Sequence, residues 1–148
     1  MIIYRQAISL DDLEGSCLFE DIFTAHRWGN CWRNGVYDYD HYHSTAHEVL
    51  GILSGNVTVQ LGGPEGIKVK LVKGDAVVLP AGISHKNLGS SADFKCVGAY
   101  PEGQNYDMNY GKPSERPGAD LNIRKVLLPL ADPLFGDSGP LMHIWKIK

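Results

Sequence analysis

GVYDYDHYHSTAHEVLGILSG, residues 35–55, is the most informative stretch of this 148-residue chain. Within eight positions it holds three histidines and a glutamate, at His41, His43, His47 and Glu48. His43 and His47 lie four residues apart, as metal ligands on one helix face do, whereas His41 and His43 lie two apart, as ligands on one strand face do. Whether this stretch is helix or strand therefore decides which side chains can share an ion.

The residues before His41 favour a strand. Tyrosine and aspartate alternate after Val36, which is typical of a half-buried strand, and a helix would separate His41 and His43 by about 200°. In a strand, the two Cα atoms lie about 6–7 Å apart on one face, so two imidazoles can converge on one ion. Residues 44–47 can then turn the chain, so that Glu48 opens the next strand and offers a third ligand.

A second stretch, GDAVVLPAGISH over residues 74–85, offers a fourth ligand. Gly74 and Asp75 begin a strand pattern, Pro80 and Gly82 end it, and His85 follows the turn. Spacing alone does not place His85 near the first stretch.

Together the two stretches resemble the two signature motifs of the cupin superfamily. The first motif is matched by Gly35, His41, His43, Glu48 and Gly55, and the second by Gly74, Pro80, Gly82 and His85. From average glycine and proline usage, the four glycines and the proline alone would coincide by chance on the order of once in a million. The motifs span residues 35–89, and the surrounding strands extend the resemblance to about Tyr100. It departs at Gly89, where the family has an asparagine; the nearest asparagine here is Asn87. Residues 28–51 and 97–107 further resemble a group of small, single-domain, uncharacterised cupins, a likeness that covers most of the chain.

The resemblance implies an all-β fold, a double-stranded β-helix or jelly roll of six to eight strands. It also implies one divalent transition metal per chain (iron, manganese, nickel, copper or zinc), with His41, His43, Glu48 and His85 as ligands. Such a ligand set leaves open positions for water or substrate. The alternative is a metal-free pocket in which the same four groups bond to each other. His47 is expected to point away from Glu48, beside the site or at the surface, unless a bulge exchanges their roles.

The chain is expected to fold as a single domain. Residues 1–34 would form an N-terminal helical and strand extension packed on the barrel, residues 35–100 the cupin core, and residues 101–148 a C-terminal extension. Residues 10–26 are the only segment predicted to be helical. Strands are predicted over residues 36–43, 48–55, 56–63, 67–74, 75–80 and 93–100. The segment after residue 101 is expected to wrap around the barrel, with a partly mobile tail as the alternative.

Composition argues against macromolecular partners. The net charge is −3, and the 14 basic residues form no run that would bind a nucleic acid or an anionic membrane. Charged residues follow Ile3 too closely for a signal peptide or a spanning helix, so a cytoplasmic location is predicted.

The separated Cys17, Cys31 and Cys96 are predicted to be buried, reduced thiols. A homodimer is expected because cupins commonly pair sheets across an exposed edge.

The predicted function is that of a metal-dependent enzyme, of oxygenase or isomerase type, that acts on a small molecule. Glu48 and Tyr39 are the predicted catalytic residues, because Glu48 can move a proton and Tyr39 shares a face with the ligand histidines. The alternative is a cupin that binds or senses a small molecule without turnover. Trp28, Trp32, Arg33 and Asn34 are expected near the pocket rim, with Arg33 either a carboxylate anchor or a solvated side chain.

Overall fold

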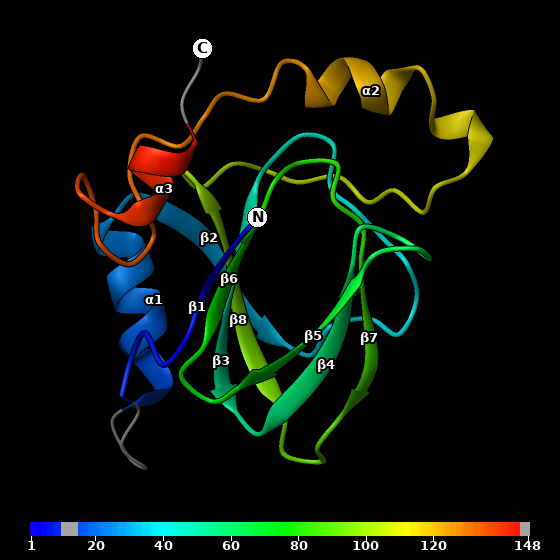
Figure 1. Cartoon of the computed structure of the whole chain (residues 1–148). Coiled ribbons are helices and arrows are strands. Elements are labelled where there is room, and N and C mark those ends of the chain that lie inside the picture. The colour runs from blue at the N-terminus through cyan, green and yellow to red at the C-terminus, as the bar shows by residue number, and fades with distance from the viewer. Residues whose placement is uncertain (10–14, 146–148) are drawn as a thin grey trace.

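The computed structural model describes residues 1–9 and 15–145. Within them, eight strands form two antiparallel sheets that face each other as the walls of a barrel (Figure 1). One sheet has the order β1-β6-β3-β8-β2 and the other the order β5-β4-β7. The strands are β1 (Ile2–Tyr4), β2 (Trp28–Asn34), β3 (Glu48–Ser54), β4 (Asn56–Leu61), β5 (Ile67–Val72), β6 (Ala76–Leu79), β7 (His85–Ser90) and β8 (Lys95–Pro101). This architecture confirms the predicted all-β double-stranded β-helix.

The helices lie outside the barrel. They are α1 (Gly15–Ala25), the 3-10 turn η1 (Pro113–Glu115), α2 (Gly118–Ile123) and α3 (Pro140–Ile144). The first confirms the helix predicted within residues 10–26, although residues 10–14 lie outside the described part of the chain. The prediction of a single helical segment is wrong, because α2 and α3 have only six and five residues and show little periodicity in sequence. No helix in residues 1–9 and 15–145 has the length and hydropathy that crossing a membrane requires.

Strand β3 is buried on both faces, which determines where each of its side chains lies. Leu50 and Ile52 belong to the cluster of buried residues inside the barrel, whereas Val49 belongs to a second cluster on the outer face of the sheet. Because side chains alternate along a strand, Glu48 points into the barrel, and residue 47 lies on the outer side. The same alternation in β8 turns Tyr100 inward.

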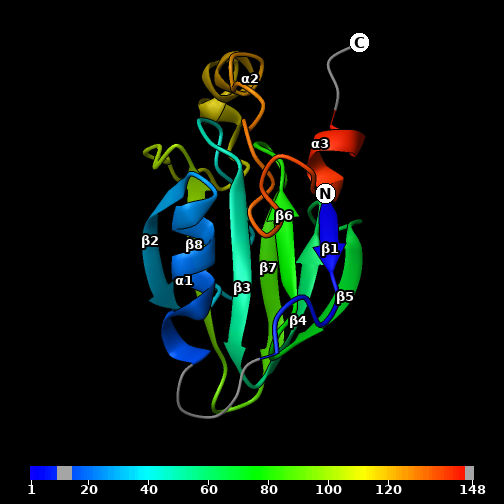
Figure 2. The ribbon, with the colours of Figure 1, turned by 90° about the vertical axis from the view of Figure 1, so that its left-hand side faces the viewer.

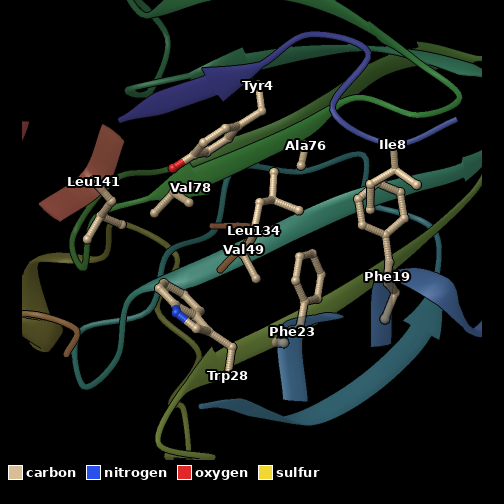
Figure 3. Packing of buried hydrophobic residues seen from close by; sticks show 12 residues of the cluster. Tyr4, Ile8, Phe19, Phe23, Trp28, Val49, Ala76, Val78, Leu134 and Leu141 are labelled. Atoms are coloured by element: carbon tan, nitrogen blue, oxygen red, sulfur yellow. The ribbon is translucent and has the colours of Figure 1, made fainter. Parts of the chain in front are cut away.

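The outer cluster joins the five-stranded sheet to α1 and to the C-terminal segment (Figures 2 and 3). Phe19 and Phe23 of α1 are fully buried there, and each such side chain contributes about 2–3 kcal/mol on burial. The helix approaches closely because Gly51 of β3 has no side chain: a Cβ there would lie 2.7 Å from the Phe19 ring. The helix and the C-terminal segment therefore pack against the outer face of the sheet that carries Glu48.

The predicted strand over residues 36–43 is not a continuous strand. His41 forms a single antiparallel bridge with His85, and Tyr42 forms another with Asn109. The segment changes partner from one residue to the next, so it forms no ladder with either neighbour. The predicted strands at 48–55, 56–63, 67–74, 75–80 and 93–100 correspond to β3, β4, β5, β6 and β8. Strands β1 and β2 lie within residues 1–34, where strand was expected without bounds, whereas β7 was not predicted.

After β8 the chain crosses one end of the barrel and returns to β1, which agrees with the expected wrap (Figure 1). Asp132, which is fully buried, holds the end of this segment in place. Its carboxylate accepts hydrogen bonds from the Tyr4 hydroxyl at 2.6 Å and from the amides of Leu134, Phe135 and Leu141 at 2.9–3.1 Å. The division of the chain at residues 34 and 100, into an N-terminal extension, a cupin core and a C-terminal extension, stays a prediction.

The cysteines only partly match expectation. Cys96 is buried in β8, as predicted, and burial raises the pKa of its thiol to about 12. Cys17 and Cys31 are exposed, so the prediction of burial is wrong for both. The reason is positional, because Cys17 lies in α1 outside the sheet and Cys31 in β2, an edge strand.

Candidate metal centre

Four side chains from separate parts of the sequence meet inside the barrel. His41 and His85 are brought together by their backbone bridge, in which the His85 amide donates to the His41 carbonyl at 2.9 Å and the reverse bond is 3.3 Å. Their ring centroids are 4.1 Å apart. One ring nitrogen each from His41, His43 and His85 lies within 4.8 Å of the other two. The bridge thus supplies the proximity that sequence spacing could not.

Glu48 completes the group as the first residue of β3. Its Oε2 atom lies 3.4 Å from His43 Nε2 and 3.2 Å from His85 Nε2. Its Oε1 atom accepts a hydrogen bond from the Tyr100 hydroxyl at 2.8 Å. The side chain is 2% exposed, yet Oε2 has no hydrogen-bond partner. A buried carboxylate oxygen without a partner is costly unless a ligand satisfies it.

The three imidazoles are held in the same tautomer. The Nδ1 atoms of His41, His43 and His85 lie 3.1, 2.6 and 3.2 Å from the backbone carbonyl oxygens of Tyr39, Asp107 and Ile83, respectively. Because a carbonyl oxygen only accepts, each Nδ1 carries the proton, and the neutral ring has its lone pair on Nε2. Histidines that bind metals are commonly oriented in this way by a carbonyl group.

This donor set fits a divalent metal ion. Three imidazole lone pairs and a carboxylate oxygen face one another in a buried space, where they repel unless a cation or protons lie between them. Nitrogen ligands with one carboxylate suit iron, manganese, nickel, copper and zinc. The residues present therefore match the chemistry of the ions that the sequence resemblance implies.

Burial and mutual charge shift the pKa values within the group. Burial, together with the nearby His85, lowers the pKa of His41 to about 4. Burial alone would raise the pKa of Glu48, but the neighbouring His43 and His85 outweigh it and hold that pKa below its usual range. For His43, burial is again opposed by Glu48, and the net result is a raised pKa. Glu48 is therefore ionised and His41 neutral at pH 7, as metal ligation requires.

The loop after β8 supports the histidines from outside the barrel. Asp107 accepts hydrogen bonds from the amides of Ser44 at 2.6 Å and Thr45 at 3.3 Å, and from the Ser44 hydroxyl. Its own carbonyl orients His43. Sequence reasoning missed Asp107, because it lies in an irregular segment whose position depends on tertiary contacts. It also missed the Tyr100 contact, although the predicted strand over residues 93–100 includes that residue.

The four side chains line a cavity of about 220 Å³. Its walls are largely aromatic and apolar, formed by Trp32, Val36, Tyr37, Leu50, Tyr100, Tyr106 and Met108. Tyr37 and Tyr106 are 53% and 40% exposed, so they lie toward the opening. The volume is below the range of typical drug-sized pockets, which suits a small organic molecule.

Of two other predicted site residues, Tyr39 lies away from the cavity and Arg33 borders it. Tyr39 is 41% exposed and does not line it; its ring stacks on Tyr37 and contacts the His41 ring edge-on at 5.8 Å. Arg33 borders the cavity, but its guanidinium pairs with the Glu20 carboxylate and contacts Cys17, both on α1. Arg33 was predicted either to anchor a carboxylate of the ligand or to be solvated. Its half-exposed side chain agrees better with the second prediction.

His47 lies on the outer side of the sheet, away from the ligand group. Its Nδ1 accepts a hydrogen bond from the Ala81 amide at 2.9 Å, and its ring contacts Trp145 edge-on at 5.0 Å. At 7% exposed it is buried rather than at the surface, because the C-terminal segment covers this face. Burial lowers the pKa of His47 to about 4.

The motif departure at Gly89 is accommodated locally. The Gly89 amide donates to the Asn87 side-chain oxygen at 2.7 Å, next to a register shift between β4 and β7. The nearest asparagine in the sequence thus supports the backbone at this point.

The sequence, the barrel and the histidine cluster together define a class. The family described as Cupin domain matches residues 33–96, and the chain belongs to the cupin superfamily. Over 145 residues it is 45% identical to the uncharacterised protein YjlB of Bacillus subtilis (strain 168), covering 98% of this chain and 85% of that protein.

Solved structures with similar folds share little sequence. Acireductone dioxygenase from Bacillus anthracis, with a cadmium ion in its active centre, is 19% identical over 64% of each chain, with a TM-score of 0.45. Procruciferin, the 11S globulin from Brassica napus, is 19% identical over 54% of this chain, with a TM-score of 0.44. This chain spans only 21% of the procruciferin chain.

Proposed function

We propose that this cupin binds one divalent transition metal per chain through His41, His43, Glu48 and His85, and that it is an enzyme acting on a small molecule in the adjoining cavity. The observation that carries the proposal is the common orientation of the three imidazoles. Each is held by a backbone carbonyl at Nδ1, so that the neutral ring has its lone pair on Nε2, beside a buried carboxylate oxygen without a partner.

The metal, when bound, would supply Lewis-acid or redox chemistry at open coordination positions. The protein's own groups would prepare that chemistry. The aromatic and apolar parts of the walls would reduce the water around a bound molecule, which would strengthen the electrostatic interactions inside the cavity. Glu48, ionised and inside the cavity, stays a predicted proton acceptor, a role that would require its Oε2 atom to leave the metal. The catalytic role of Tyr39 stays a prediction, and its ring contact with His41 is the route by which it would act. Oxygenase and isomerase reactions both fit this arrangement, and the homodimer and the cytoplasmic location also stay predictions.

Metal content tests the site directly. We expect about one metal ion per chain in the wild-type protein by elemental analysis, and a sharp loss in His43→Ala and in His85→Ala with the barrel still folded. His26→Ala is the matched control, because the His26 Nδ1 also hydrogen-bonds a backbone carbonyl, that of Pro133 at 3.0 Å, but takes no part in the ligand group. Equal metal content in all four proteins would place the ion elsewhere.

Oxygen uptake tests catalysis. If the purified protein holds iron and consumes dioxygen in the presence of a small carboxylate or diketone, that result would support the oxygenase proposal. Tightly bound zinc with no turnover of any compound in such a panel would instead favour a binding or sensing role.

A further inference from the structure

Tyr100 donates a hydrogen bond to the candidate ligand Glu48. It lies in β8, is fully buried, and borders the cavity. Its hydroxyl has two partners: it accepts from Trp32 Nε1 at 2.7 Å and bonds to Glu48 Oε1 at 2.8 Å. A tyrosine that was buried only for packing could use any polar group as its hydrogen-bond partner. Here the acceptor is a candidate metal ligand.

The direction of this chain of hydrogen bonds is fixed by chemistry. The indole nitrogen of Trp32 can only donate, so it occupies an acceptor position of the Tyr100 oxygen. An ionised carboxylate can only accept, so the single hydroxyl proton of Tyr100 points to Glu48. Bonds to an ionised acceptor are about twice as strong as neutral ones.

The backbone makes room for this arrangement. Trp32 of β2 pairs with Gly98 of β8 in the sheet register, and the indole lies directly over that glycine. A Cβ at Gly98 would lie 2.5 Å from the indole nitrogen and closer still to two ring carbons. The close approach of the indole, and with it the bond to Tyr100, therefore depends on the absence of a side chain there.

The consequence is that the two oxygens of Glu48 differ. Oε1 is tied to Tyr100, whereas Oε2 has no hydrogen bond and lies beside His43 and His85. The ring of Tyr106 stacks on Tyr100, with centroids 4.4 Å apart, and it limits rotation of the phenol. The carboxylate is thus held in one orientation before any ion enters.

We propose that Trp32 and Tyr100 are positioning residues that fix the Glu48 carboxylate so that Oε2 alone is presented to the metal. The proposal rests on the metal site proposed above. It predicts that loss of the Tyr100 hydroxyl weakens metal binding and changes the coordination geometry, even though no metal ligand is removed.

Cobalt(II) is a suitable probe, because its visible absorption reports coordination geometry as well as binding. We would titrate Co²⁺ into the metal-free wild-type protein and into Tyr100→Phe, Trp32→Phe and Tyr4→Phe. The last is the matched control, since Tyr4 also donates to a buried carboxylate, that of Asp132, outside the barrel. Thermal unfolding of each metal-free protein checks that the variants are folded.

The expected result for Tyr100→Phe is about 10- to 100-fold weaker Co²⁺ binding and an altered visible spectrum. Trp32→Phe is expected to change both in the same direction by less, and Tyr4→Phe to keep the wild-type spectrum and an affinity within about twofold. Wild-type affinity and spectrum in Tyr100→Phe would overturn the positioning role. If that variant does not fold, the same result in Trp32→Phe would overturn it. A wild-type protein that binds no Co²⁺ would refute the metal site, and the positioning role with it.

Discussion

The contact between Gly98 and Trp32 gives a quantitative test of how the barrel is packed. In Gly98→Ala, the added methyl group would lie 2.5 Å from the indole nitrogen, where about 3.5–4.0 Å is the optimum for non-bonded atoms. The indole must therefore move by about 1 Å. It has little freedom to do so, because its nitrogen is bonded to Tyr100 and its ring packs against the inner cluster.

The cost has two parts. Forcing a methyl group into a packed site costs about 1–3 kcal/mol, and loss of the Trp32–Tyr100 hydrogen bond adds about 1 kcal/mol. We therefore expect the free energy of unfolding of Gly98→Ala to fall by about 2–4 kcal/mol. For a chain of this size, that corresponds to a fall of about 6–12 °C in the midpoint of thermal unfolding.

Urea unfolding of the metal-free protein would measure this change without the contribution of a bound ion. Gly89→Ala is the matched control: Gly89 also lies in a strand, but a Cβ there would have nothing within 4 Å. It is expected to stay within about 1 kcal/mol of wild type, on the stabilising side. If Gly98→Ala is as stable as wild type, or if both variants lose equal stability, the packing argument is refuted.

Three further predictions concern the C-terminal segment, the buried histidine and the metal. Asp132→Ala removes the acceptor of four donors, three of them in buried hydrogen bonds, so urea unfolding should show a loss of at least about 3 kcal/mol. Asp120→Ala, at an exposed ion pair, should show no measurable change. The pKa of His47 is lowered to about 4 in the folded state, so the unfolded state binds its proton first as pH falls from about 6.5. The free energy of unfolding should thus decline between pH 6.5 and 4 by up to about 3 kcal/mol from this residue, and His47→Gln should flatten that decline. Adding metal at 100 times its dissociation constant should raise the stability of wild type by about 2.7 kcal/mol, and a chelator should reverse the gain, whereas His85→Ala should show neither effect.

Much of the fold follows from local sequence. The short apolar runs from Glu48 to Leu79, each ended by turn residues, predict four of the eight strands of the described chain, because burial leaves a signature in neighbouring residues. The strand β7 has no such signature, since only its first residue, His85, is buried. Short helices such as α3 were missed for a similar reason, because five residues hold too little periodicity to detect.

The candidate site, too, could be predicted from local sequence only in part. Motif spacing in the sequence indicated which imidazoles and which carboxylate to consider, since residue type and separation carry that information. Tertiary contacts, by contrast, bring His41 and His85 together through a backbone bridge, place Tyr100 and Asp107 beside the site, and leave Tyr39 outside the cavity. These contacts join residues 44 to 64 positions apart, and they depend on how the two sheets close, which no local pattern records. Residue type and spacing thus indicate the candidate ligands, and the closure of the barrel fixes how they lie relative to one another.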